Sequence, residues 1–75
     1  MRLSEAKIGQ SYEVERLDTM DRVTRRLEAL GLTGQTRITV LNSKKRGCMI
    51  IKVRGTRWAI GRPIAEGIQV KEAAL

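Results

Sequence analysis

Side chains that could perform catalysis or bind a metal are scarce in this chain. There is no histidine, which excludes a metal site of two histidines and one carboxylate within one chain. Cys48 is the only cysteine, so neither an internal disulfide nor a cysteine-rich metal site can form. The carboxylates of Glu13, Glu15, Asp18 and Asp21 fit a solvated strand edge and a helix start better than a metal site. We therefore expect no bound metal and no cofactor.

The sequence also lacks the residue patterns of an enzyme. It has no histidine base, no glycine-rich phosphate loop of the Walker type and no nucleophile with a matched partner. Cys48 is interpreted as a small residue at the start of a strand. We predict a protein without catalytic activity.

Basic side chains are the polar groups that the sequence supplies in excess. Lys and Arg total 15 against 8 Asp and Glu, which gives a formal net charge of +7. They form three groups, in an expected loop, on an expected helix and on later strands: Lys44, Lys45 and Arg46; Arg22, Arg25 and Arg26; Arg54, Arg57 and Arg62. Such a charge favours nucleic acid, anionic lipid or an acidic protein surface, and does not choose among them.

The aromatic residues argue against single-stranded nucleic acid. Tyr12 and Trp58 are the only aromatics, and both fall at positions that we expect to face the core. Proteins that bind single strands stack the bases on exposed aromatic rings, and no such platform is visible here. A nucleic-acid-binding module is therefore an alternative to a protein-binding adaptor.

One amphipathic helix is the clearest of the elements that must position these groups. Met20, Val23, Leu27 and Leu30 recur at steps of three and four residues, which predicts a helix over about residues 19–30. Thr19 or Asp18 is expected to cap its start with a side-chain oxygen.

The end of this helix has the pattern of a Schellman motif. Gly31 stands where a left-handed residue is needed, and Leu32 can then fold back onto Leu27. Gly34 permits a second tight turn directly afterwards.

Short alternating stretches predict strands on both sides of the helix. We expect strands over residues 11–17, 36–41, 48–54, 57–61 and 68–71, and a short helical turn near residues 62–66. Glycines are expected at the turns that separate these elements: Gly9, Gly47, Gly55 and Gly67. The predicted core contains Leu27, Leu30, Ile38, Val40, Ile51, Val53 and Ile60.

These elements predict a mainly β fold in a single domain over residues 1–75. Short strands with tight turns bury one face most economically when the sheet curls on itself, so we expect a small SH3-like barrel with the helix closing one end. An oligonucleotide-binding fold is the alternative, although its strands are usually longer. We see no signal peptide and no apolar stretch near the roughly 20 residues of a membrane helix, so we expect a cytoplasmic protein without membrane insertion.

Two stretches resemble the FeoA family, small cytoplasmic proteins of bacterial ferrous iron uptake. They are R-R-L-E-A-L-G-L-T-G, from Arg25 to Gly34, and V-R-G-T-R-W-A-I-G-R-P-I-A-E-G-I-Q-V, from Val53 to Val70. The opening L-S-E-A-K-I-G is also similar to the usual start of that family. Thr33 and Cys48 stand where relatives often carry proline, and turns tolerate both changes.

The resemblance implies an SH3-like barrel and a partner, the cytoplasmic portion of the membrane transporter FeoB. Docking would change the GTPase activity, the assembly or the gating of the transporter. Transition-metal binding, which the resemblance associates with the family, would then describe the pathway more than this chain. The resemblance leaves a homodimer open, and the same module resembles the C-terminal domain of metal-dependent repressors, a second alternative.

We expect the partner to contact apolar side chains left on the outer barrel face. Ile50 and Leu41 are the candidates, because their strand positions point away from the core. Leu32 is a weaker candidate, because it already has a structural role beside Leu27. Lys44, Lys45 and Arg46 would steer the encounter electrostatically.

Overall fold

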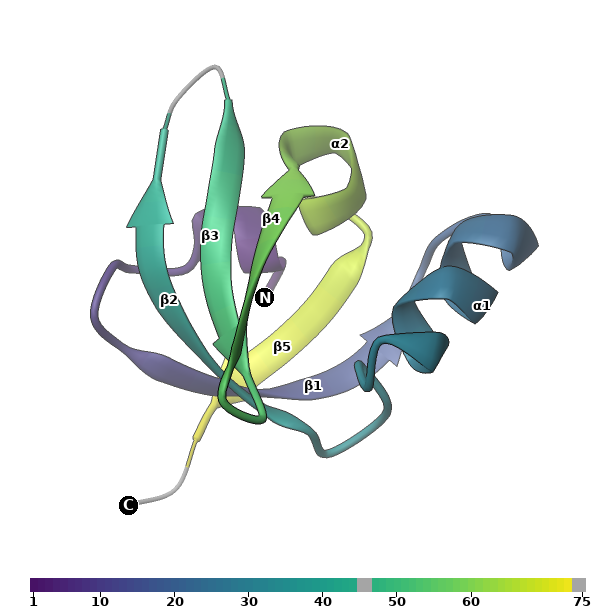
Figure 1. Ribbon diagram of the computed structural model, residues 1–75, viewed down its shortest axis with the longest axis horizontal. Helices are drawn as coiled ribbons and strands as arrows, with labels where there is room; N and C mark the ends of the chain where they lie inside the picture. Colours follow the sequence, from purple (N-terminus) through teal and green to yellow (C-terminus); the bar gives the residue numbers. More distant parts are fainter. Residues whose placement is uncertain (45–46, 74–75) are drawn as a thin grey trace.

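The computed structural model describes residues 1–44 and 47–73, and this part of the chain forms a mainly β domain (Figure 1). Its elements, in chain order, are η1 (Leu3–Glu5), β1 (Ser11–Leu17), α1 (Asp21–Ala29), β2 (Arg37–Ser43), β3 (Cys48–Val53), β4 (Thr56–Gly61), α2 (Arg62–Ala65) and β5 (Ile68–Glu72). The predicted order of strands and helices is confirmed, and β1 has the predicted bounds. The helical turn expected near residues 62–66 is α2.

The five strands form one antiparallel sheet in the order β4-β3-β2-β1-β5. β1 lies between β2 and β5, which brings the first and last strands of the chain side by side. The sheet curls strongly, and α2 bridges from β4 to β5 across its open side (Figure 1). This is the curled small barrel that the short strands predict.

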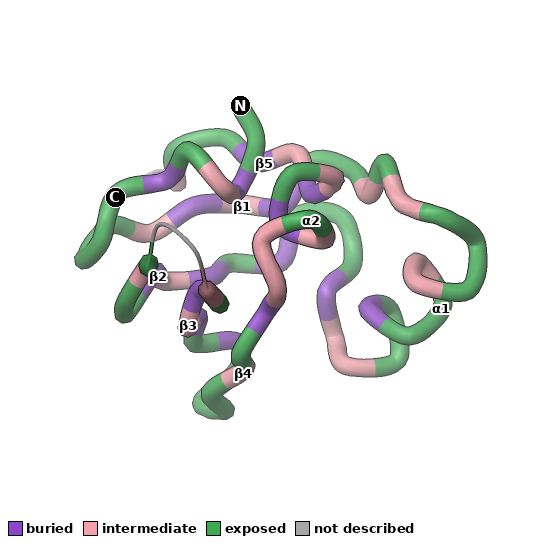
Figure 2. The backbone as a smooth tube through the Cα atoms, turned by 90° about the horizontal axis from the view of Figure 1, so that it is seen from above, coloured by how far each residue is buried: buried purple, intermediate pink, exposed green. Residues whose placement is uncertain are grey.

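The core lies inside this curl and is built by alternation along the strands. Every second residue of β3 is buried, while Ile50 and Lys52 between them face outward. Figure 2 shows the buried positions concentrated on the strands. The predicted core residues that are buried are Leu27, Ile38, Val40, Ile51, Val53 and Ile60.

Two β-bulges break this alternation. The β1–β5 register shifts between Val14 and Arg16, so Leu17 turns back toward the core. The β2–β3 register shifts between Val40 and Asn42, which leaves Leu41 as the extra residue.

The start of α1 differs from the sequence-based expectation. The helix begins at Asp21, and Met20 is the N-cap residue, with no hydrogen bond from its side chain. Asp18 instead pairs with Arg16 at 3.0 Å, and the Thr19 and Thr24 hydroxyl oxygens lie 2.6 Å apart. The predicted cap by Thr19 or Asp18 is therefore wrong, because both side chains have other partners.

The end of α1 is the predicted Schellman motif. Gly31 has φ +97°, and its N–H donates to the Glu28 carbonyl at 3.0 Å. The Leu32 N–H donates to the Leu27 carbonyl at 3.0 Å. Leu30, predicted to be buried, is the C-cap residue and only half-buried, because Leu27 and Leu32 fill the space that faces the barrel.

The helix lies at the side of the barrel and does not close one end of it (Figure 1). Among its nine residues only Leu27 is buried. Most of the α1 surface is therefore open to solvent, as Figure 2 also shows.

The predicted turn glycines fall into two groups. Gly9, Gly31 and Gly55 have positive φ, as tight turns require, whereas Gly34 and Gly67 do not. The φ angle of Gly47 involves Arg46, which lies outside the described residues. In the second tight turn after α1 the residue with positive φ is Gln35, at +68°, directly after Gly34. Between β3 and β4 the turn is formed by Arg54 and Gly55, both with positive φ, which is the usual geometry of a two-residue hairpin.

Candidate functional site

The candidate functional site is a surface for binding a partner. Among residues 1–44 and 47–73 no group of three His, Cys, Asp or Glu side chains is placed to hold a metal ion. Cys48 is an exposed free thiol. The candidates are therefore surfaces on which exposed apolar and charged side chains gather.

An apolar groove lies between the start of α1 and α2. Its volume is about 290 Å³, and it is lined by Asp18, Thr19, Met20, Val23, Pro63 and Ile64. Met20 is 79% exposed, the largest exposed fraction among the large apolar side chains of the described residues. Val23 and Ile64 are half-buried and pack against the core, so the groove is a continuation of the core to the surface.

The chain fixes the two walls of this groove through a close backbone contact. The Asp18 N–H donates to the Gly67 carbonyl at 2.6 Å. A Cβ on residue 67 would lie 2.5 Å from the Asp18 carbonyl oxygen, so only glycine allows this approach. Residues just before α1 and just after α2 are thereby held together, which sets the separation of the groove walls.

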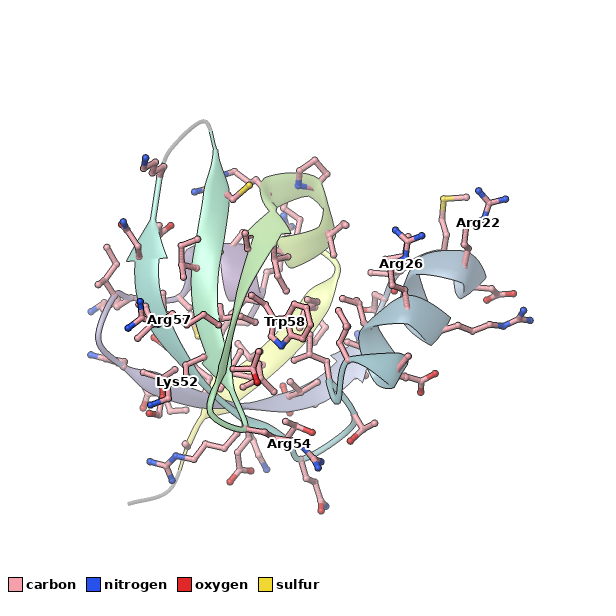
Figure 3. All side chains as sticks on the ribbon, viewed as in Figure 1. Arg22, Arg26, Lys52, Arg54, Arg57 and Trp58 are labelled. Atoms are coloured by element: carbon pink, nitrogen blue, oxygen red, sulfur yellow. The ribbon has the colours of Figure 1, made fainter. Side chains whose placement is uncertain are left out.

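The exposed face of α1 beside the groove is basic. Arg22, Arg25 and Arg26 are all exposed, and Arg22 and Arg26 extend from the outer turns of the helix (Figure 3). Asp21 and Glu28 are also exposed on α1, and Asp18 lines the groove, so the helix surface near the groove carries both signs of charge with arginines in excess.

Sequence reasoning missed this groove because it placed Met20 on the buried face of the helix. To place Met20 correctly, the exact residue at which the helix begins would have to be known. At the N-cap the backbone is extended, with ψ 147°, and the side chain no longer follows the helical face.

Two of the apolar residues predicted to bind a partner do face outward. Leu41 is 37% exposed, and Ile50 is half-buried between Asn42 on β2 and Ala59 on β4. Leu32 is fully buried, so it is unavailable to a partner, and its assignment to the binding surface is wrong. The Schellman motif directs the Leu32 side chain into the core beside Leu27.

The predicted basic hairpin is only partly described. Lys44 is exposed, whereas Lys45 and Arg46 lie outside the described residues. Arg62 reaches across to this hairpin, where Nη2 donates to the Lys44 carbonyl at 2.5 Å and lies 3.3 Å from the Ser43 Oγ. Arg62 is therefore a link between α2 and the end of β2, and not a surface cation as its sequence position suggests.

None of the helices in the described part of the chain has the length and hydrophobicity needed to span a bilayer.

Comparison with known proteins gives the family. The model of the FeoA domain matches residues 1–72. The crystal structure of an iron uptake regulatory protein (FeoA) is 33% identical, with a TM-score of 0.88 over 97% of this chain and 96% of that one. FeoA protein from Chlorobium tepidum is 35% identical, with a TM-score of 0.90 over 99% of this chain and 71% of that one. No curated protein sequence matches the chain.

Two further structures define the fold. Stenotrophomonas maltophilia FeoA, complexed with zinc and described as an SH3 domain protein, is 25% identical, with a TM-score of 0.85 over 95% of this chain and 89% of that one. A manganese-dependent transcriptional repressor has a TM-score of 0.88 over 97% of this chain and 41% of that one, at 21% identity, which shows a shared fold alone. The SH3-like barrel is thus confirmed, and with a family model over nearly its whole length, the chain belongs to the FeoA family.

Proposed function

We propose that this protein is a non-catalytic cytoplasmic accessory protein of ferrous iron uptake that docks on the cytoplasmic portion of the transporter FeoB. The FeoA family is implicated in ferrous iron transport, which supports the pathway. Binding would change the GTPase activity, the assembly or the gating of the transporter, and this chain would supply contacts and no catalytic group.

The exposed Met20 in the groove between α1 and α2 is the observation that carries this proposal. Leaving 79% of a large apolar side chain in water is unfavourable, and a partner that covers it recovers that free energy. Methionine also adapts its shape to different partners, since it is unbranched and polarizable. A groove of about 290 Å³ has room for one or two apolar side chains of a partner helix or loop.

Charge around the groove fits an acidic partner surface. Arg22, Arg25 and Arg26 lie on the exposed side of α1, where they would accelerate association without supplying most of the affinity. The apolar contact in the groove would determine the dissociation rate.

The burial of the aromatic residues favours a protein partner over single-stranded nucleic acid. Tyr12 is 1% exposed, and its hydroxyl oxygen accepts a hydrogen bond from the Lys7 N–H at 2.9 Å. Trp58 is half-buried and packs against the core. Neither ring is available as a stacking platform.

The proposal is tested by capturing FeoB from bacterial membranes with the tagged protein. We expect the wild-type protein to retain FeoB, identified by mass spectrometry, and Met20→Asp to lose it, because a carboxylate in the groove repels an apolar side chain. Ile8→Asp is the matched control, since Ile8 is 57% exposed and lies outside the groove. Ile50→Asp tests the face predicted from sequence.

Three outcomes are distinguishable. Loss with Met20→Asp alone supports the groove. Loss with Ile50→Asp alone supports docking through the outer strand face and contradicts the groove. The proposed function is contradicted if the wild-type protein retains no FeoB in any detergent that keeps FeoB active in GTP hydrolysis.

A further inference from the structure

The charges of this protein are segregated along the chain. Residues 29–65 contain eight Lys and Arg residues and no Asp or Glu. The rest of the chain contains seven Lys and Arg residues against eight Asp and Glu. The net charge of +7 therefore comes entirely from the segment that forms β2, β3, β4 and α2.

The sheet places much of this charge on one surface. Thr39 on β2, Lys52 on β3 and Arg57 on β4 are cross-strand neighbours in one row. Thr39 and Lys52 lie between buried residues, and Arg57 is exposed next to the half-buried Trp58, so the three point to the outer side of the barrel. Figure 3 shows Lys52 and Arg57 extending to the same side of β3 and β4. We call the outer side of β2, β3 and β4 the basic face.

A shallow concavity lies at one end of the basic face. Its volume is about 510 Å³, and it is lined by Gln35, Thr36, Arg37, Thr39, Lys52, Arg54 and Gly55. Two of these residues, Gln35 and Arg54, hold positive φ values of +68° and +51° although neither is glycine. Their fixed backbones frame an open hollow with guanidinium and ammonium groups at its edge, which suits an oxyanion presented by a surface.

The other end of the basic face is apolar. Ile50 and Ala59 are neighbours on β3 and β4, two positions along the strands from Lys52 and Arg57 and therefore on the same face. Leu41 is the bulged residue of β2 beside them and is 37% exposed. Proteins that lie on a membrane surface combine basic side chains with neighbouring exposed aliphatic side chains.

This composition decides between possible polyanions. A nucleic-acid backbone has phosphates but offers no aliphatic phase to Leu41 and Ile50, whereas a bilayer offers both. A specific protein interface is normally centred on anchor side chains packed in desolvated pockets, and the hollow of the basic face is lined by polar and basic residues. A diffuse negative surface with an apolar layer beneath it fits best.

We propose that the basic face binds the anionic phospholipid headgroups of a bilayer surface. The phosphate group of a lipid would lie in the hollow beside Lys52 and Arg54, with Arg57 next to Lys52 on β4, while Leu41 and Ile50 meet the acyl boundary. This contact is peripheral and does not depend on the groove between α1 and α2. Figure 1 shows α1, which forms one wall of that groove, on the side of the barrel away from β2.

Vesicle binding of matched charge variants tests the proposal. The probe is a vesicle of phosphatidylglycerol and phosphatidylethanolamine, with phosphatidylcholine vesicles as the neutral reference. The face variant combines Lys52→Gln, Arg54→Asn and Arg57→Gln, with Asn at residue 54 because it tolerates positive φ. The helix variant combines Arg22→Gln, Arg25→Gln and Arg26→Gln, so both variants lower the formal net charge of +7 by three.

We expect the wild-type protein to bind the anionic vesicles at physiological salt and not the neutral ones. Each cation at the surface should contribute about a fivefold factor in the partition coefficient, so the face variant should bind about 100-fold more weakly. The helix variant should stay within about fivefold of the wild type. Leu41→Ser should weaken vesicle binding, and the binding that remains should be more sensitive to salt because it is mainly electrostatic.

A measurement on the wild-type protein removes any doubt about folding of the variants. Lipid nanodiscs with spin-labelled headgroups should broaden the amide signals of Leu41, Lys52 and Arg57 more than those of α1. Uniform broadening, equal loss of vesicle binding by the two triple variants, or no binding to anionic vesicles would each overturn the proposal. So would tighter binding of duplex DNA or RNA that displaces the protein from vesicles.

Discussion

The backbones of Asp18 and Gly67 are in direct contact, although 48 positions separate them in the chain. The Asp18 N–H donates to the Gly67 carbonyl at 2.6 Å, and the position of a Cβ on residue 67 is occupied by the Asp18 carbonyl oxygen. Asp18 follows β1 and Gly67 precedes β5, so this contact joins the ends of two paired strands. It also holds the residues before α1 against those after α2, which shapes the groove that we propose for the partner.

Gly67→Ala should destabilise the protein by about 1–3 kcal/mol, the range of overpacking changes. The added methyl group would lie 2.5 Å from the Asp18 carbonyl oxygen and 2.7 Å from the Thr19 side chain, so the backbone must move. Denaturant unfolding measures the change. Gly34→Ala is the control, because its Cβ would meet nothing closer than 3.9 Å and should leave stability unchanged or raise it by about 0.4–1 kcal/mol. Equal stability of the two variants would contradict the contact.

Gly31→Ala tests the end of α1. Gly31 has φ +97°, where an L-residue with a Cβ loses about 1–2 kcal/mol. The methyl group would also lie 3.4 Å from the Arg54 Nε. A thermal melt should therefore show a lower midpoint despite the better helix propensity of alanine. Gly61→Ala is the control and should leave the midpoint unchanged, because Gly61 has φ −62°. An unchanged midpoint for Gly31→Ala would refute the Schellman motif.

Leu27→Ala tests the attachment of α1 to the barrel. Leu27 is the buried residue of that helix, so its truncation should destabilise the protein by about 2–5 kcal/mol. Met20→Ala, at the residue that precedes the helix, should change stability by less than about 0.5 kcal/mol, because Met20 is 79% exposed. Chemical denaturation compares the two, and similar losses would mean that the helix face is misassigned.

Ferrous ion should bind the purified monomer only weakly. The chain has no histidine and one cysteine, and the described residues contain no cluster of three metal-ligating side chains. Anaerobic titration calorimetry should show no stoichiometric site of sub-micromolar affinity. Such a site would contradict the prediction, and a dependence of the affinity on protein concentration would indicate ligands shared between two chains.

Local patterns predicted most of this fold. The bounds of β1, the alternation along β3 and the Schellman motif at Gly31 all follow from rules that act within a few residues. These rules succeed because backbone geometry and side-chain alternation are local properties.

The errors arose where long-range contacts decide the structure. The Asp18 side chain forms an ion pair with Arg16 and does not cap the helix. The Arg62 side chain hydrogen-bonds the backbone at the end of β2 and does not extend into solvent. The groove beside Met20 depends on α2 meeting α1 through Gly67, a contact between residues far apart in sequence. Hydrophobic periodicity within one element carries no information on such contacts.

The central claim is most directly tested by the affinity of the protein for FeoB at two salt concentrations. Biolayer interferometry would use detergent-solubilised full-length FeoB and, in parallel, its soluble GTPase domain. We predict binding that persists from physiological to high salt, with slower association at high salt, because the groove contact is apolar and the arginines of α1 only steer the encounter. Met20→Asp should raise the dissociation rate, and Ile8→Asp should not. No binding to either form of FeoB, together with tight salt-sensitive binding to RNA or DNA, would contradict the account.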